Sequence, residues 1–328
     1  MPDTILKNVP GMATAIPVPV LRAETLSDRV FQNDYVAFSR PCLIKGAVAH
    51  WPATRKWRDR DYLKRICGRH DVHYWPHENH LTAKRANPGI ARMAFADAVE
   101  RLHSARPQEM GSIGCNPGTP EMLRDLGGFS FFGGGEPGFN YSPFRLFMFR
   151  NAGTTWHYHS FDETLMCQVV GNKKVGLLRV GNPYHHFLRN IFYREDYYED
   201  PTVFNAVSDA DLQWFVADLE DGDALYIPPL WWHGVAVTSD RPGVTAPIVW
   251  RSPPQIIADS LRKMAAGAFE MTGDFVQQEL GNLMAMARKL GLEREFETAW
   301  KFGVAHGLIA MTDYAGNRWP PTSAWPPA

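Results

Sequence analysis

Two segments decide the fold of this chain: WHYHSFDE at residues 156–163 and GDALYIPPLWWH at residues 222–233. Together they supply three imidazoles and one carboxylate, the donor types of a mononuclear metal site. The candidate donors are His157, His159, Glu163 and His233. Because successive strand residues point to opposite faces, His157 and His159 share one face if this segment is extended. The pattern predicts that two ligands from the first segment meet one from the second.

Glu163 has the same parity as the two histidines, but four residues of straight strand would carry it about 13 Å beyond His159. It reaches the same ion only if the chain bends at residues 160–162, where small and polar residues permit a bend. Asp162 is a second candidate carboxylate and ranks below Glu163, because its strand parity is opposite. His233 follows a predicted strand at residues 224–227 that two prolines interrupt. A closed barrel would bring the two segments face to face.

Three further motifs accompany the metal segments. They are RPCLIKG at 40–46 with Trp51-Pro52, QVVGNK at 168–173, and LYIPP at 225–229. The His pair, the later Glu and the GDxxxxP frame before His233 resemble the cupin signature, with Leu230 where cupins usually have glycine. The wider chain, over about residues 25–255, resembles the cupin-like Jumonji-C proteins related to the asparaginyl hydroxylase of hypoxia-inducible factor.

This resemblance implies a mainly β fold with some α: a double-stranded β-helix (cupin or jelly-roll) barrel with an N-terminal helical cap and C-terminal helices. The predicted regions are an N-terminal cap with the first strands at 1–110, the barrel core at 111–253 and a C-terminal helical region at 254–328. The implied activity is that of a non-heme iron(II) oxygenase. We expect a 2-oxoglutarate-dependent hydroxylase, a dioxygenase, acting on a protein side chain or a small molecule.

The resemblance makes His157, Glu163 and His233 the catalytic metal ligands, with His159 as a fourth or replacement ligand. The Jumonji-C branch usually has Asp or Glu where this chain has His159. Three histidines plus Glu163 would leave fewer open positions for a bidentate co-substrate. Two alternatives therefore stay open: a cupin dioxygenase or isomerase that works without 2-oxoglutarate, and a non-catalytic cupin that binds a ligand or partner.

A lysine pair follows the turn signal Gly171-Asn172 between the apolar runs 165–170 and 175–180, which predicts a hairpin. Only one of Lys173 and Lys174 can face inward. In the resembling hydroxylases the inward lysine pairs with the far carboxylate of 2-oxoglutarate, and Lys173 holds that place. We expect a hydroxyl donor to the same carboxylate from Thr154 or Thr155.

Composition favours a packed enzyme, since 328 residues with 45% hydrophobic and 21% charged provide a sizeable core. The net charge of −1 without a basic block predicts no primary role in nucleic-acid binding. No apolar segment reaches the length of a membrane span, so no membrane partner is expected. The scattered cysteines indicate a reducing compartment and a cytoplasmic location. They are Cys42, Cys67, Cys115 and Cys167.

Helical periodicity predicts two cap helices at residues 59–67 and 95–103, and alternation predicts a barrel strand at 144–150. After the prolines at 253–254 the pattern becomes helical over most of residues 255–310. These helices either cover the chain's own barrel or form a homodimer, as in the resembling hydroxylases.

Overall fold

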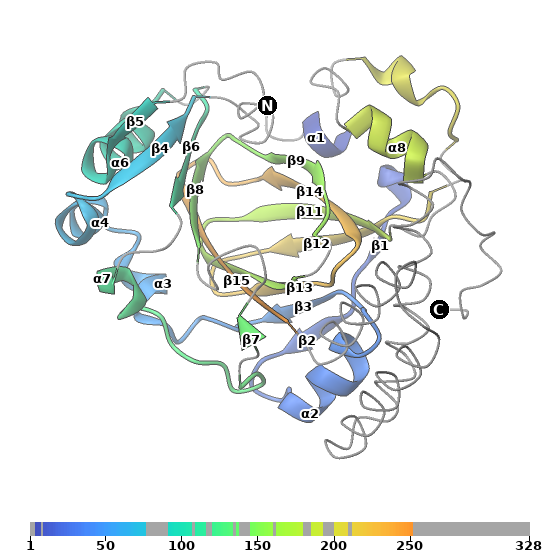
Figure 1. Cartoon of the computed structure of the whole chain (residues 1–328), viewed down its shortest axis with the longest axis horizontal. Helices are drawn as coiled ribbons and strands as arrows, with labels where there is room; N and C mark the ends of the chain where they lie inside the picture. The colour runs from blue at the N-terminus through green and yellow to red at the C-terminus, as the bar shows by residue number, and fades with distance from the viewer. Residues whose placement is uncertain are drawn as a thin grey trace, which may run out of the picture.

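The computed structural model describes residues 4–7, 9–76, 91–106, 109–115, 120–133, 136–137, 145–159, 162–179, 185–192, 200–208 and 212–251. Within these ranges the strands form two sheets that face each other and close around a common centre (Figure 1). This is the mainly β barrel architecture that the sequence predicts. No helix in the described ranges is both long and apolar enough to cross a membrane.

The smaller sheet has five strands. In spatial order they are β1 (Ile16–Pro17), β12 (Phe215–Leu219), β11 (Lys173–Arg179), β14 (Trp231–Val237) and β9 (Thr154–His157). The larger sheet has ten strands. They are β2 (Val20–Arg22), β3 (Cys42–Lys45), β13 (Ala224–Ile227), β10 (Glu163–Val170), β15 (Gly243–Arg251), β8 (Leu146–Arg150), β6 (Gly111–Cys115), β4 (Asp71–Trp75) and β5 (Ala91–Ala94), with β7 (Glu136–Pro137) beside β15.

Helices lie outside the barrel (Figure 1). Those of the described ranges are α1 (Thr4–Lys7), α2 (Asp28–Val30), α3 (Pro52–Lys56), α4 (Arg60–Cys67), α6 (Phe95–Ser104), α7 (Pro120–Leu123) and α8 (His185–Phe192), the 3-10 segments η1 (Met12–Thr14) and η3 (Pro201–Phe204), and the π-helical η2 (Phe31–Val36). Helices α4 and α6 confirm the two predicted helices, and their role as an N-terminal cap stays a prediction. Asp59 caps α4 by accepting hydrogen bonds from the backbone amides of Asp61 and Tyr62.

Strands β8 to β11 alternate between the two sheets, and this corrects the predicted hairpin at Gly171. Strand β10 pairs with β13 and β15, whereas β11 pairs with β12 and β14. Gly171, at φ 87, therefore turns the chain from one sheet to the other instead of closing a two-stranded pair. Gly171 does form a turn, as predicted. However, β10 and most of β11 are buried, and each strand has a neighbouring strand on both sides.

Strand β8 confirms the predicted alternation and shows which face lines the barrel. Leu146 and Met148 join the main hydrophobic core between the larger sheet and the N-terminal elements. Phe149 faces the other way, because the Lys173 Nζ from the opposite sheet lies 3.9 Å from its ring centroid. The predicted C-terminal region at 254–328, with its helices and the homodimer, lies outside the described residues.

Candidate metal centre

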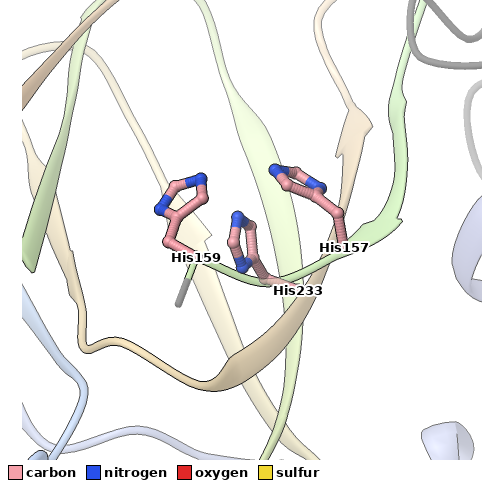
Figure 2. Close-up of side chains that lie close together, drawn as sticks. All are labelled: His157, His159 and His233. Atoms are coloured by element: carbon pink, nitrogen blue, oxygen red, sulfur yellow. The ribbon is translucent and has the colours of Figure 1, made fainter. Parts of the chain in front are cut away.

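Three histidines converge inside the barrel (Figure 2). Strands β9 and β14 are neighbours in which His157 stands opposite His233, and His159 follows directly after β9. One ring nitrogen from each histidine lies within 4.8 Å of the other two. The ring centroids of His157 and His233 are 4.1 Å apart, and that of His159 lies 5.0 Å from His233. The structure thus brings together the three predicted imidazoles.

Hydrogen bonds at Nδ1 orient two of these rings. The Nδ1 of His157 lies 2.9 Å from the carbonyl oxygen of Thr155, and the Nδ1 of His233 lies 2.9 Å from that of Trp231. A carbonyl only accepts, so each Nδ1 carries the proton and each Nε2 keeps a lone pair. In both cases the carbonyl lies two residues earlier on the same strand. This is the outer-shell arrangement that orients histidines toward a metal ion.

His159 is held differently. Its Nδ1 lies 2.9 Å from the hydroxyl oxygen of Thr164, which can accept or donate. When Thr164 accepts, the Nε2 of His159 is available as the third ligand. No motif in the sequence points to Thr164, whose only signal is its position five residues after His159.

Burial and neighbouring groups favour the neutral form of His159 and His233. Burial lowers the pKa of His159 well below its usual value, and the nearby His157 and Arg145 lower it further. Burial also lowers the pKa of His233, with His157 and His159 adding to the effect. Neutral imidazoles offer lone pairs without competition from protons near neutral pH. The set therefore fits a divalent cation that accepts nitrogen ligands.

Leu230 connects the two metal segments through an unusual backbone conformation. It has φ 63, in the left-handed region, at the position where cupins usually have glycine. Its backbone amide donates to the carbonyl oxygen of His159 at 2.7 Å. Its side chain is buried in a cluster with Trp232 and Leu188. We infer that apolar burial offsets the conformational cost that glycine would avoid.

The structure separates Glu163 from the three histidines, contrary to the prediction that it joins them. Thr164 contacts His159, so the adjacent Glu163 points to the other face of β10. There its fully buried carboxylate accepts a hydrogen bond of 2.6 Å from the Tyr226 hydroxyl. Burial and Glu163 raise the pKa of Tyr226 well above its usual value, so this tyrosine stays a donor.

The error lies in the strand parity. The prediction continued the alternation of His157 and His159 to residue 163, but the alternation shifts by one residue before Thr164. Asp162 is also buried and also lies outside the group of converging ligand atoms. Within the described residues, that group contains histidines only.

Lys173 faces into the barrel, as the resemblance implies, and Lys174 faces out, so only one of the two points inward as strand parity requires. Lys173 is 3% exposed, whereas the side chain of Lys174 is 45% exposed and lies 3.7 Å from Asp218. The Lys173 Nζ donates to the hydroxyl of Thr245 at 2.5 Å. No carboxylate of the described residues forms an ion pair with it. Burial lowers the pKa of Lys173 to about 7.

The two predicted threonines are buried in β9 beside the histidines. Thr155 contributes its carbonyl oxygen to His157, a role that the sequence did not suggest. A contact between the hydroxyl of Thr154 or Thr155 and a co-substrate carboxylate stays a prediction.

Comparison with known proteins agrees with a barrel of the cupin class. The chain belongs to the cupin-like domain family, which matches residues 27–256. A lysine-specific demethylase from Arabidopsis thaliana is 30% identical over 229 residues, which make up 64% of this chain and 50% of that protein. A Jumonji C domain-containing protein from Drosophila melanogaster is 26% identical over 71% of this chain and 59% of its own length.

A human tRNA wybutosine-synthesizing protein is 24% identical over 72% of this chain and 79% of its own length. The aligned region spans only about half the length of the Arabidopsis relative and somewhat more of the Drosophila one. These relatives confirm the predicted cupin-like Jumonji-C family. The narrower likeness to the asparaginyl hydroxylase stays a prediction.

Proposed function

We propose that this protein is an iron(II)- and 2-oxoglutarate-dependent oxygenase that hydroxylates a C–H bond of a protein side chain or a small molecule. The observation that carries the proposal is Lys173, a buried lysine that faces the interior of a barrel containing three converging histidines. A buried ammonium group without a carboxylate partner is unfavourable. It becomes favourable when an anionic ligand arrives.

The donor set suits the proposed metal. His157, His159 and His233 would hold iron(II), and imidazole donors also suit other divalent ions. Three imidazoles are one protein ligand fewer than three histidines plus Glu163, so a bidentate co-substrate would meet less competition at the ion. The Glu163 carboxylate accepts a hydrogen bond from Tyr226, which supports a site of three histidines without Glu163.

The positions of the two sites match a ligand with two different ends. On β11, Leu177 stands opposite His233 and Lys173 lies four residues earlier on the same strand. That separation corresponds to about 13 Å of strand, which the lysine side chain and a bound dicarboxylate together can bridge. The 2-oxo acid end would meet the metal, and the far carboxylate would meet Lys173.

When bound, the metal and 2-oxoglutarate supply the oxidising power for hydroxylation. The chain itself contributes orientation and exclusion of water. Its histidines fix the metal end, and Lys173 fixes the other end of the co-substrate. The sequence-based expectation of a cytoplasmic location accompanies this proposal.

The substrate class that we propose is broader than the substrates named for the relatives. Those names refer to lysine demethylation for the Arabidopsis protein and to tRNA wybutosine synthesis for the human one. Such different substrates on related chains support an oxygenase scaffold without selecting one substrate. A protein side chain or a small molecule remains our proposal.

The three-imidazole set also favours a second candidate, a cupin dioxygenase or isomerase that works without 2-oxoglutarate. It lacks the carboxylate that completes the usual two-histidine, one-carboxylate site. This candidate leaves the inward ammonium group of Lys173 unexplained. We therefore rank it second.

Anaerobic titration of the iron(II)-loaded protein with 2-oxoglutarate tests the proposal. A saturable visible charge-transfer band is expected when the 2-oxo acid chelates the metal. Pyruvate serves as the matched probe, because it has the chelating end but no far carboxylate, and it should bind more weakly. Bound iron without a band for 2-oxoglutarate would favour the second candidate.

A further inference from the structure

We propose that Gln168 and Thr245 are positioning residues that hold the ammonium group of Lys173 where the far carboxylate of 2-oxoglutarate binds. This inference rests on the proposed function and deepens it. It assigns the co-substrate end of the barrel to a connected set of side chains from β10, β11 and β15, which we call the lysine relay.

The donor and acceptor roles in the lysine relay can be assigned in only one way. The Lys173 Nζ donates to the Thr245 hydroxyl at 2.5 Å, so the single hydroxyl hydrogen of Thr245 is free to donate onward. It donates to the Gln168 Oε1 at 2.9 Å, and the Gln168 Nε2 then donates to the backbone carbonyl of Val170 at 2.7 Å. Because a carbonyl only accepts, the relay ends there, and each bond fixes the next.

The backbone of Gln168 is itself anchored. Its amide donates to the carbonyl of Asp223, and its carbonyl accepts from the amide of Gly222, both at 2.8 Å. The pairing of β10 with β15 shifts register between Gln168 and Val170, which marks an irregularity at this position. A Cβ added at Gly243 would lie 3.6 Å from the Gln168 Nε2 and 3.0 Å from the Val170 oxygen. The absence of a side chain at Gly243 thus avoids a tight contact with the Val170 carbonyl, which accepts the hydrogen bond from the Gln168 amide.

The chemistry of the lysine relay suits a binding site. An ammonium group has three donors, and Thr245 takes one of them. The ring face of Phe149, 3.9 Å from the Nζ, attracts the charge without neutralising it. Gln168 is an amide, so the relay orients the lysine without supplying a competing negative charge. A carboxylate in its place would pair with the lysine and oppose an incoming anion.

Binding measurements on three variants test the inference. In the iron(II)-loaded full-length protein, Thr245→Val should weaken 2-oxoglutarate binding about tenfold, the scale of a lost hydrogen bond to a charged group. Pyruvate binding should stay unchanged, and Thr245→Ser should restore 2-oxoglutarate affinity. Gln168→Glu should weaken 2-oxoglutarate more than Thr245→Val does. Unchanged 2-oxoglutarate affinity in Thr245→Val, or an equal loss for pyruvate, would overturn the assignment.

A second readout separates this inference from the proposed function. The pKa of Lys173 can be followed by NMR of the full-length protein with labelled lysine Cε, assigned through Lys173→Met. Removing an acceptor from the ammonium group should lower this pKa in Thr245→Val. An unchanged pKa would overturn the lysine relay even if the wild type binds 2-oxoglutarate. A lowered pKa with no 2-oxoglutarate band in the wild type would instead refute the proposed function and leave the support of Lys173 by Thr245 standing.

Discussion

The two polar ends of the barrel interior, the histidines and Lys173, suit ligands of opposite charge. At the histidine end, imidazole rings are held mainly by backbone carbonyls, and two of the three are partly exposed. At the lysine end, one amine is buried and donates to the hydroxyl of Thr245, which in turn donates to Gln168. Between them, β11 and β14 contribute apolar residues such as Val175 and Val235.

The difference shows what each end needs. Neutral nitrogen donors need a cation, whereas the buried lysine needs an anion. A metal ion alone would leave the lysine unpaired, and a simple carboxylate would leave the histidines unused. A chelating dicarboxylate with a metal ion satisfies both ends at once. The following variants change one end while leaving the other intact.

The largest effect is expected from His233→Ala. His233 is the most buried of the three rings and stands opposite His157, so its loss removes a ligand that no described neighbour can replace. Metal content after dialysis should fall from about one equivalent to near zero. Elemental analysis measures this, and an unchanged melting temperature in metal-free buffer shows that the fold persists. Retained stoichiometry would contradict the ligand assignment.

Lys173→Met should remove the proposed binding partner of the far carboxylate of 2-oxoglutarate. We expect 2-oxoglutarate affinity to fall about 100-fold, the range seen when a buried charge partner is removed. Metal content should stay the same. Lys174→Met is the matched control, since Lys174 points outward and lies 3.7 Å from Asp218. Equal losses in the two variants would remove the distinction between the lysines.

The Lys173→Met variant should also be more stable than the wild type. Between pH 10.5 and about 7 the unfolded chain binds a proton at Lys173 that the folded protein releases, so wild-type stability falls as the pH drops through this window. Below about pH 7 the penalty is complete, at most about 5 kcal/mol. Melting temperatures at pH 7 and well above pH 10.5 measure it, and the gain of the variant should vanish at the higher pH.

His159→Asp tests the feature that sets this chain apart from its branch. An aspartate would restore the usual carboxylate, and its charge would attract both the metal ion and the nearby Arg145. We expect iron(II) to bind about tenfold more tightly than in the wild type. His159→Ala is the reference that removes the ligand altogether. If His159→Asp binds iron no better than His159→Ala, residue 159 does not ligate the metal.

Much of this site could be predicted from sequence because the needed information is local. Parity allowed only one of Lys173 and Lys174 to face inward, and the resemblance to the hydroxylases pointed to Lys173. The two metal segments themselves supplied the three histidines. Thr245 could not be found this way, since it lies 72 residues from Lys173 and meets it only across the sheets. The prediction of a hairpin was wrong for a related reason. A turn signal at Gly171 does not indicate which sheet the next strand joins.

Glu163 shows the limit of parity arguments, because a single shifted residue exchanges the two faces of a strand. Its carboxylate meets Tyr226 on the outer face, where aromatic rings from Phe31 and Trp250 surround the tyrosine. The structure therefore makes Glu163 a packing and hydrogen-bonding residue. The smallest effect on metal binding should follow from its replacement.

Glu163→Gln should change the iron(II) affinity by less than about twofold while lowering stability by about 1–2 kcal/mol, since a buried hydrogen bond to Tyr226 is altered. Tyr226→Phe removes the same bond from the other side and is the matched variant. If the bond alone matters, the stability losses of the double variant should be less than additive. Loss of metal from Glu163→Gln, with metal retained in Tyr226→Phe, would mean that Glu163 ligates the ion when it is bound. That outcome would restore the four-ligand site and the shortage of open positions that disfavours 2-oxoglutarate.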